Sequence, residues 1–492
     1  MNFFRKRREK KRKMKEQIEL EQIIMTLYLE FTVSQKYIEA QTGKKYYKGE
    51  NEILNRLLYK SVKGQKLPQP DLPNNTLNHN FAKPLVDQKV NYCLGKPPKY
   101  TCEDEKYLEW FENWIDENNF NYWLNYLATE TSNSGLAWLQ VYINEKGELK
   151  FVVLPFNQVI PIWEDSLHTK LKAVVKVYET VTDNIMVPEM QTHLEYWTKE
   201  GMQSYKVDGS NLFLDTHSFD WLQEVQGDFS GFQPHYLNGD KTPGYWNRIP
   251  FIPIKNNIME QPDIIPLKNL IDNYDLTRSD LSNELAELRN YLITVANAGG
   301  TDIEEFIQNL KLYGVAFVDN VTGDSTGSNI GVLSNPMDCT ASTTHSNLLK
   351  QNIIELGQGV NFNLEMTIPP SGVSLKLLYQ GLEIKCHGLE QQFDLAFKEL
   401  EYFITTYLEM QNMKPTAPLK MEFQLNSIVN DQEQADTLNK QMDAYRKAKG
   451  VVSDKTLYEN HPWVLDAEEE MKRTESQADD YFHKGDLRKY GL

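Results

Sequence analysis

The stretch LKNLIDNYDLTRSDLSNELAELRNYLITVA, residues 267–296, decides the fold of this chain. It carries a stripe of side chains at alternating spacings of four and three: Leu267, Ile271, Tyr274, Arg278, Leu281, Leu285, Leu288 and Leu292. This is the heptad spacing of a helix that packs along one side, and Arg278 is its only charged member. A helix of about 27 residues spans about 40 Å, and its other face is acidic. The pattern predicts either an ordinary long core helix or a rod that packs against copies of itself, and the sequence favours neither.

A compact insert and a returning helix follow this stretch. The insert extends to residue 340 and combines the strand YLITVA with a short helix over DIEEFIQNL and a strand over YGVAFVD. Apolar side chains on one side of residues 343–358 predict the returning helix. The segment NFNLEMTIPPSGVS, residues 361–374, has no periodicity and few charges, so we expect a loop there.

The last quarter of the chain is predicted to be mainly helical. A helix over residues 375–411 would be about 55 Å long, with Gly381 and Gly388 as candidate kink points. A strand over residues 419–425 and three short helical pieces follow it. Two side chains in the last pieces are expected helix N-caps: Ser453 and Asp466.

The chain upstream of the heptad helix predicts an antiparallel β region over residues 136–255. The strands LAWLQVYI and LKFVVLPF flank the turn Asn144–Gly147 and predict a β-hairpin. Further strands are expected over four short ranges: 171–178, 192–198, 203–207 and 211–215. Helices are expected over residues 103–117 and 122–132, and Gly43 and Gly49 have the character of helix ends or turns.

The charge of the chain is distributed unevenly. The net charge of the 492 residues is -17, but residues 5–15, RKRREKKRKMK, carry nine basic residues against Glu9. The rest of the chain therefore carries about -25, whereas a protein that coats DNA needs a basic face. An amphipathic stretch with Ile23, Ile24, Leu27, Tyr28 and Phe31 follows the basic run. No apolar run is long enough for a membrane span or a signal peptide, so we expect no membrane contact and synthesis in the cytosol.

The sequence carries no motif of known catalytic or metal-binding chemistry. Its four cysteines are scattered and form no CxxC pair: Cys93, Cys102, Cys339 and Cys386. Phosphate-binding loops of the GxxxxGK[ST] type, HExxH, GxSxG and usable GxGxxG motifs are missing. The carboxylate runs Glu468–Glu470 and Asp479-Asp480 fit a solvated helix face better than a metal site. We therefore expect no enzyme activity, no cofactor and no metal ion.

Several short segments, in order along the chain, resemble the portal proteins of siphophage-type tailed bacteriophages. VDQKVNYCLGKPPKY, residues 86–100, resembles the family stretch in which a Val-Asp-x-x-x-x-Tyr helix leads into Leu-Gly-Lys-Pro. A Tyr-Tyr-x-Gly element, an Ile-Leu pair and an Asn-Asn loop of the family are matched by Tyr46, Tyr47, Gly49, Ile53, Leu54, Asn74 and Asn75. Three later segments are similar to the stem and clip, the junction of tunnel loop and long helix, and the C-terminal helical pair: residues 271–300, 371–383 and 459–471. The basic N-terminal run departs from the family pattern.

The resemblance implies an α+β portal fold with a β-rich wing, long stem helices, a small α/β clip, a long wing helix and a helical crown. The implied boundaries are wing 1–262, stem helix 263–291, clip 292–340, second stem helix 341–358, tunnel loop 359–374, long wing helix and strand 375–428, and crown 429–492. The implied function is a ring, expected to hold twelve subunits, at one capsid vertex of the virion. Double-stranded DNA would pass through it during packaging and ejection.

The resemblance also implies partners and functional residues. The partners are the terminase of the packaging motor, scaffolding protein, major capsid protein and a head-completion adaptor, met first in the host cytoplasm. The tunnel loop is expected to face DNA through Asn361, Phe362, Asn363, Glu365, Met366, Pro369, Pro370 and Ser371. With a single charge, at Glu365, this loop could brush phosphates without binding them. The alternative is a buried loop packed by Phe362, Leu364, Met366 and Ile368.

The basic run is expected to form an arm that contacts an acidic partner, either scaffolding protein or packaged DNA. Its candidate residues are Arg5, Lys6, Arg7, Arg8, Lys10, Lys11, Arg12 and Lys13. The alternative is a disordered, solvated tail. Deletion of residues 2–15 distinguishes the two, because only a partner-binding arm is needed for incorporation into procapsids or for genome retention.

Two other functions stay open at this point. One is a different phage head or connector protein, or an accessory protein that binds peptidoglycan or DNA, without an axial channel. The other is a DNA-packaging enzyme such as a nuclease or ATPase, which the missing phosphate-binding loop disfavours.

Overall fold

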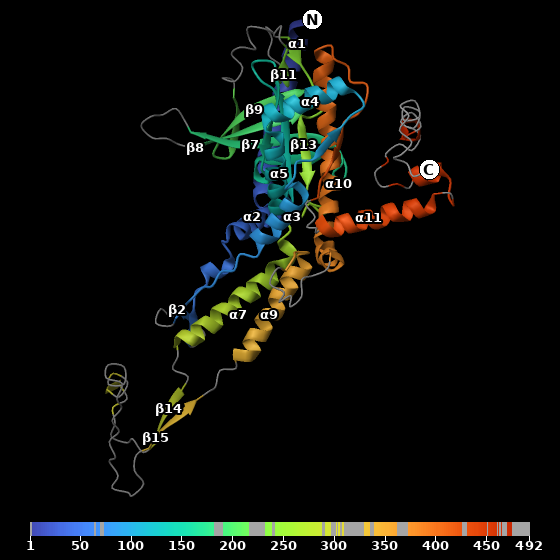
Figure 1. Ribbon diagram of the computed structural model, residues 1–492. Helices are drawn as coiled ribbons and strands as arrows, with labels where there is room; N and C mark the ends of the chain where they lie inside the picture. The colour runs from blue at the N-terminus through green and yellow to red at the C-terminus, as the bar shows by residue number, and fades with distance from the viewer. Residues whose placement is uncertain are drawn as a thin grey trace. The chain divides into compact units, whose positions relative to one another are not determined.

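The structure is a computed structural model, shown in Figure 1. It describes residues 2–62, 65–68, 73–181, 190–215, 232–238, 242–287, 291–296, 302, 304–305, 308, 329–334, 339–361, 372–425, 431–449, 451–459, 461, 464 and 470–474. The chain divides into two compact units: Met1–Asn363 with Gly381–Asn426, and Leu364–Gln380 with Ser427–Leu492. Helices and sheets are mixed throughout, so the predicted α+β class is confirmed.

Two antiparallel sheets form the centre of the first unit. The predicted hairpin is confirmed: β4 (Leu136–Ile143) pairs with β5 (Leu149–Leu154), and β13 (Phe251–Lys255) pairs with the other edge of β4. The second sheet has the strand order β10-β9-β8-β7-β6. Its strands are β6 (Val159–Trp163), β7 (Leu171–Val181), β8 (Met190–Thr198), β9 (Gly201–Asp208) and β10 (Asn211–Leu214). The four predicted strands after the hairpin are thus confirmed, and β6 is an addition.

The N-terminal helices pack against these sheets. The second half of α1 (Asn2–Thr32) buries Ile24 and Met25 against Val175 and Leu194 of the five-stranded sheet. Ile23, which the amphipathic pattern grouped with Ile24, is instead exposed because it lies on the solvent side of the helix.

The two N-terminal glycines have different roles. α2 (Gln35–Lys48) ends at Gly49 with φ 78°, a left-handed conformation that glycine adopts without strain, so the prediction of a helix end there is confirmed. The same prediction for Gly43 is wrong, because Gly43 lies inside α2 and is buried. A Cβ atom there would lie 1.9 Å from the carbonyl oxygen of Asn133, so glycine is needed for the close approach of α2 and α5.

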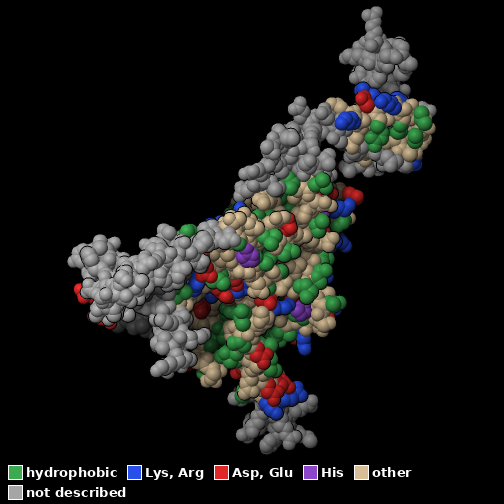
Figure 2. Space-filling model, turned by 90° about the horizontal axis from the view of Figure 1, so that it is seen from below, with side chains coloured by type: hydrophobic (Ala, Val, Ile, Leu, Met, Phe, Trp, Pro, Cys, Tyr) green, Lys and Arg blue, Asp and Glu red, His purple; other side chains and the backbone are tan. Residues whose placement is uncertain are grey.

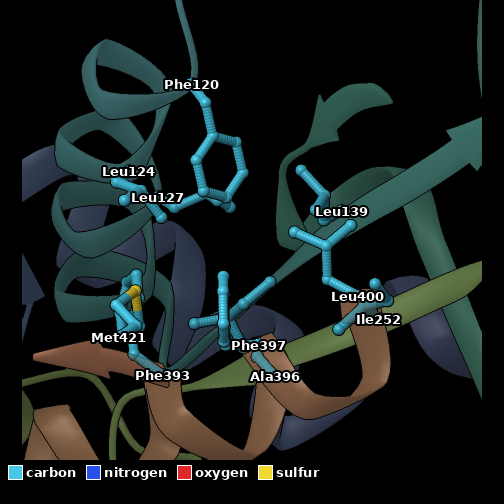
Figure 3. Close-up of a pocket in the computed structure, with 11 residues that line it drawn as sticks. Phe120, Leu124, Leu127, Leu139, Ile252, Phe393, Ala396, Phe397, Leu400 and Met421 are labelled. Atoms are coloured by element: carbon cyan, nitrogen blue, oxygen red, sulfur yellow. The ribbon is translucent and has the colours of Figure 1, made fainter. Parts of the chain in front are cut away.

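Helices α3 (Ala82–Leu94), α4 (Glu105–Asn118) and α5 (Phe120–Ser134) follow, and the last two confirm the predicted helices. The long helix α10 (Gly372–Met410) continues through both Gly381 and Gly388. Figure 3 shows the apolar core between α5, the three-stranded sheet, α10 and β16, lined by Phe120, Leu124, Leu127, Leu139, Ile252, Phe393, Ala396, Phe397, Leu400 and Met421. The cavity there measures about 20 Å³, room for one water molecule and too small for a ligand.

Smaller elements complete the described chain. The short strand pairs are β1 (Tyr59–Val62) with β2 (Gln65–Pro68), β3 (Lys99–Thr101) with β16 (Lys420–Glu422), and β11 (Tyr236–Leu237) with β12 (Pro243–Gly244). Three 3-10 helices are η1 (Glu52–Asn55), η2 (Phe156–Gln158) and η4 (Ile265–Leu267). The second unit contains α11 (Asp431–Ala448) and α12 (Asp454–Glu459). The hydroxyl of Ser453 accepts a hydrogen bond from the Thr456 amide at 3.3 Å, which confirms that N-cap, whereas Asp466 lies outside the described residues.

The heptad stretch forms α7 (Lys268–Glu287), which lies beside α9 (Cys339–Leu356), as Figure 1 shows. The chain between them passes through β14 (Tyr291–Ala296) and β15 (Asn329–Ser334), an antiparallel pair. The described part of the helix has 20 residues against the 27 predicted. The predicted strand YLITVA is confirmed as β14, so Leu292 belongs to a strand. The aromatic and β-branched run Tyr-Leu-Ile-Thr-Val favours a strand over a further helical turn. The predicted strand over residues 313–319 lies outside the described residues.

Candidate functional site

The heptad stripe of α7 is buried only at its N-terminal end. Leu267 and Ile271 are fully buried in a core cluster with Leu85 of α3 and Ile353 of α9. Further along the same stripe, Leu285 is 46% exposed. The helix pair therefore carries apolar side chains that the described single chain leaves in water.

A second stripe of α7 holds the segment that precedes α3. Asp275, Ser279 and Asn283 follow one another at intervals of four, and all three are buried. The amides of His79, Leu77 and Asn75 donate to them in turn at 2.9, 2.9 and 2.6 Å. The Asn-Asn loop thus lies along α7. The sequence analysis missed this polar stripe, although its spacing of four in an otherwise apolar and acidic helix was a usable signal.

The carboxylate of Asp275 in that stripe is fully buried. It also accepts hydrogen bonds from Asn51 at 2.7 Å and from the His79 ring at 2.9 Å. Burial raises the pKa of Asp275, and the hydrogen bonds from Asn51 and His79 oppose this shift. Satisfied buried hydrogen bonds of this kind fix the register of the segment along the helix.

A buried ionic cluster joins α3, α10 and the start of the heptad stretch. The Nζ atoms of Lys89 and Lys385 lie 3.1 and 3.2 Å from the carboxylate of Asp263. Lys89 also donates to the side chains of Asn256 at 2.5 Å and Ser132 at 3.1 Å. Burial lowers the pKa of Lys89. Burial alone would raise the pKa of Asp263, but the positive charges of Lys385 and Lys89 lower it more strongly. The pKa is therefore about 2, and the carboxylate stays charged.

The same cluster holds the end of α9, where the predicted tunnel loop begins. Lys385 donates to the carbonyl of Gly357 at 3.2 Å. Gln88 and the backbone of Val360 exchange two hydrogen bonds, at 2.9 and 3.2 Å. A Cβ atom at Gly359 would lie 2.3 Å from a methyl group of Leu85, so a larger residue there would require the Leu85 side chain to move. The chain is therefore fixed as far as Val360.

The structure places one residue of the predicted tunnel loop. We call the contacts of Gln88 and Lys385 with Val360 and Gly357 the anchor. Asn361 directly follows it and is partly buried. The others lie outside the described residues: Phe362, Asn363, Glu365, Met366, Pro369, Pro370 and Ser371. Sequence reasoning missed the anchor itself. Its one sequence signal was Lys89, which takes a core position between Leu85 and Cys93 on the apolar side of α3.

The basic arm is the first half of α1. Its backbone is helical, and the exposed side chain of Arg12 pairs with Glu16 at 3.3 Å. The side chains of Arg5, Lys6, Arg7, Arg8, Lys10, Lys11 and Lys13 lie outside the described set. Contact of the arm with an acidic partner stays a prediction.

The described residues offer no site for a metal ion and no basic surface in the view of Figure 2. Within the described residues, no three His, Cys, Asp or Glu side chains lie where they could share a metal ion. Cys93, Cys102 and Cys386 are free thiols. In the view from below in Figure 2, hydrophobic side chains are scattered over the described surface, and Lys and Arg form no continuous patch on it. None of the described helices is both long and apolar enough to cross a membrane.

Comparison with known proteins gives one consistent result. Residues 32–481 match the family described as "Phage portal protein, SPP1 Gp6-like". A portal protein of Clostridium phage phiCD119 is 29% identical over 468 residues, which cover 92% of this chain and 95% of that protein. A portal protein of Bacillus phage SPP1 is 27% identical over 454 residues, which cover 89% of this chain and 83% of that protein.

The family match includes both sheets, the α7–α9 pair and the chain as far as Val360, and it leaves out the basic arm. A heptad helix that is half exposed in the single chain fits a protein that works as part of an assembly. The chain belongs to the SPP1 Gp6-like family of phage portal proteins, the structural connectors of the phage head.

Proposed function

We propose that this chain assembles into a closed ring of about twelve copies at one capsid vertex, in which α7 and α9 form the wall of a DNA channel. The observation that carries the proposal is the exposed part of the heptad stripe, at Leu285, on a helix whose other end is fully buried. Neighbouring copies would cover the exposed apolar side chains, as in other obligate assemblies. Electron microscopy of the purified protein tests this directly.

The charge of α7 suits a channel through which DNA must slide. The solvent side of the helix carries the exposed Glu284, whereas the carboxylate of Asp280 pairs with Arg56. Each phosphate neutralised by Lys or Arg would add affinity and therefore friction, whereas an acidic wall repels the DNA and keeps it centred. This repulsion is screened within about 8–10 Å, so its cost to packaging is small.

The proposal extends to the regions and partners implied by the family. Residues 1–262 would form most of the wing, 292–340 the clip and 429–492 the crown. Terminase, scaffolding protein, major capsid protein and a head-completion adaptor would bind this ring, first in the host cytoplasm and then in the virion. The ring would have no catalytic turnover of its own. A head protein without an axial channel is not favoured, because the relatives that match over most of the chain are portal proteins.

The proposed tunnel loop gives a first prediction. Replacing Thr367–Ser371 with a short Gly-Ser linker should leave ring assembly and thermal stability nearly unchanged, because the anchor at Gln88, Lys385 and Val360 stays intact. DNA packaging or retention should fall, because the stiff Pro369-Pro370 tip is lost. The same linker at the exposed turn 144–147 is the matched control. Rings that fail to form, or that melt much earlier, would instead identify the segment as core.

A further inference from the structure

α7 and α9 each place one leucine on an otherwise polar outer face. Leu276 of α7 is 42% exposed and Leu348 of α9 is 53% exposed. Their exposed neighbours along the same faces are Asn269, Asn273, Thr344 and Gln351. Burying the remaining exposed apolar surface of each leucine is favourable by about 25 cal/mol per Å², so each of the two is a candidate for contact with another chain.

The two leucines lie at the same level of the helix pair. The helices run antiparallel, and a Cβ atom at Gly357 would lie 3.1 Å from a methyl group of Leu267, so these two residues face each other. Ile271 and Ile353, four residues further along each helix, share the same buried cluster. Five residues further again, the same register brings Leu276 level with Leu348.

Helix geometry directs these leucines to opposite sides of the pair. Five residues turn an α-helix by about 140°, so each leucine points away from the seam marked by Ile271 and Ile353. The step from Ile271 to Leu276 runs forward along α7, and the step from Ile353 to Leu348 runs backward along α9. Because the helices are antiparallel, both steps lead in the same direction in space, and both side chains turn in the same sense about the helix axes. Leu276 and Leu348 therefore point in opposite directions. This arrangement suits a head-to-tail interface, in which one face of each copy meets the opposite face of the next.

Charge selects the same pairing of helices. α7 carries five acidic and two basic residues, whereas α9 carries Lys350 and Glu355 and has no net charge. Two α7 helices side by side would repel each other, but α7 against the α9 of another copy would not.

We propose that Leu276 of each copy packs against Leu348 of the next copy around the ring. Cyclic symmetry places all copies at one height along the ring axis, and in a channel wall whose helices run along that axis Leu276 of one copy is level with Leu348 of the next. This inference rests on the proposed ring and adds which surfaces meet in it.

Cysteine cross-linking tests the contact. In a background with Cys102 and Cys339 changed to serine, Leu276→Cys with Leu348→Cys should, on oxidation, give a ladder of covalent multimers on a non-reducing gel. Either single variant should stay monomeric on the gel. Leu276→Cys with Leu356→Cys is the matched control, because Leu356 is also exposed, at 67% against 53% for Leu348, but lies two turns away. Rings of normal appearance without a ladder would overturn the contact and leave the ring intact, whereas absence of rings in the unmodified protein would overturn the ring itself.

A charge variant covers the case in which the cysteine pair does not assemble. Leu276→Asp should lower the yield of rings by about tenfold or more, because a carboxylate would be buried at every interface. Adding Leu348→Lys should restore much of that yield through a new ion pair between copies. Full ring assembly by Leu276→Asp alone would contradict the proposed contact.

Discussion

Replacing Asp263 with alanine is expected to lower the free energy of unfolding by about 3–5 kcal/mol. The substitution removes a carboxylate that lies within 3.2 Å of both Lys89 and Lys385. Lys89 is 1% exposed, so its ammonium group cannot recover the lost interaction from water. Denaturant unfolding of the purified protein measures the change, with the assembly state of both proteins checked to be the same.

Two comparison variants make this prediction specific. Asp263→Asn keeps the shape and part of the hydrogen bonding, so it should destabilise less than Asp263→Ala. Glu399→Gln breaks the exposed ion pair with Arg248 at 2.9 Å and should cost less than about 1 kcal/mol. Equal effects of Asp263→Ala and Glu399→Gln would show that the buried cluster does not hold the junction together.

The pH dependence of the same cluster follows from the pKa of Asp263. That pKa is about 2 in the folded protein, below the ordinary value of 3.8. Between these two values the unfolded chain binds more protons than the folded one, so stability falls as the pH decreases from about 4 to about 2. Above pH 4 the contribution is fully present. Asp263→Asn should lack this part of the acid sensitivity.

Replacing Gly43 with alanine is expected to destabilise the protein by about 1–3 kcal/mol or more, despite the higher helix propensity of alanine. The new Cβ atom would lie 1.9 Å from the carbonyl oxygen of Asn133, a backbone atom that cannot rotate away. Helices α2 and α5 would have to separate, and the salt bridge between Lys44 and Glu130 joins the same two helices. Thermal unfolding measures the effect.

Gly388→Ala is the matched control in another helix. A Cβ atom at Gly388 meets no atom within 4 Å, so only the helix propensity changes and stability should rise by about 0.5–1 kcal/mol. A loss of stability at Gly388 equal to that at Gly43 would mean that helix packing is not the reason for glycine at position 43.

The sequence predicted the elements whose side chains repeat with a clear period. The apolar runs LAWLQVYI and LKFVVLPF on either side of the turn 144–147 defined the hairpin, and β4 is buried on both faces from Leu136 to Val141. The heptad stripe located α7, and the β-branched run YLITVA located β14, so Leu292 fits the stripe by its spacing but lies in the predicted strand. Whether α7 is a core helix or a packing rod could not be decided, since the answer differs between its two ends.

The anchor of the loop could not be predicted, because its members are far apart in the sequence. Gln88, Asp263 and Lys385 come together only in the folded chain, and each alone looks like an ordinary surface residue. Gly43 was misread for a related reason, since the carbonyl group that requires glycine belongs to another helix. The tunnel loop and the basic arm were defined by composition and resemblance, and the roles given to them stay predictions.

Electron microscopy and native mass spectrometry of the purified protein test most directly whether the chain forms a ring. Electron microscopy should show a ring with a central hole, and native mass spectrometry should give about twelve times the 57.3 kDa of one chain. A protein that stays monomeric at every salt concentration, with and without scaffolding protein, would contradict the account.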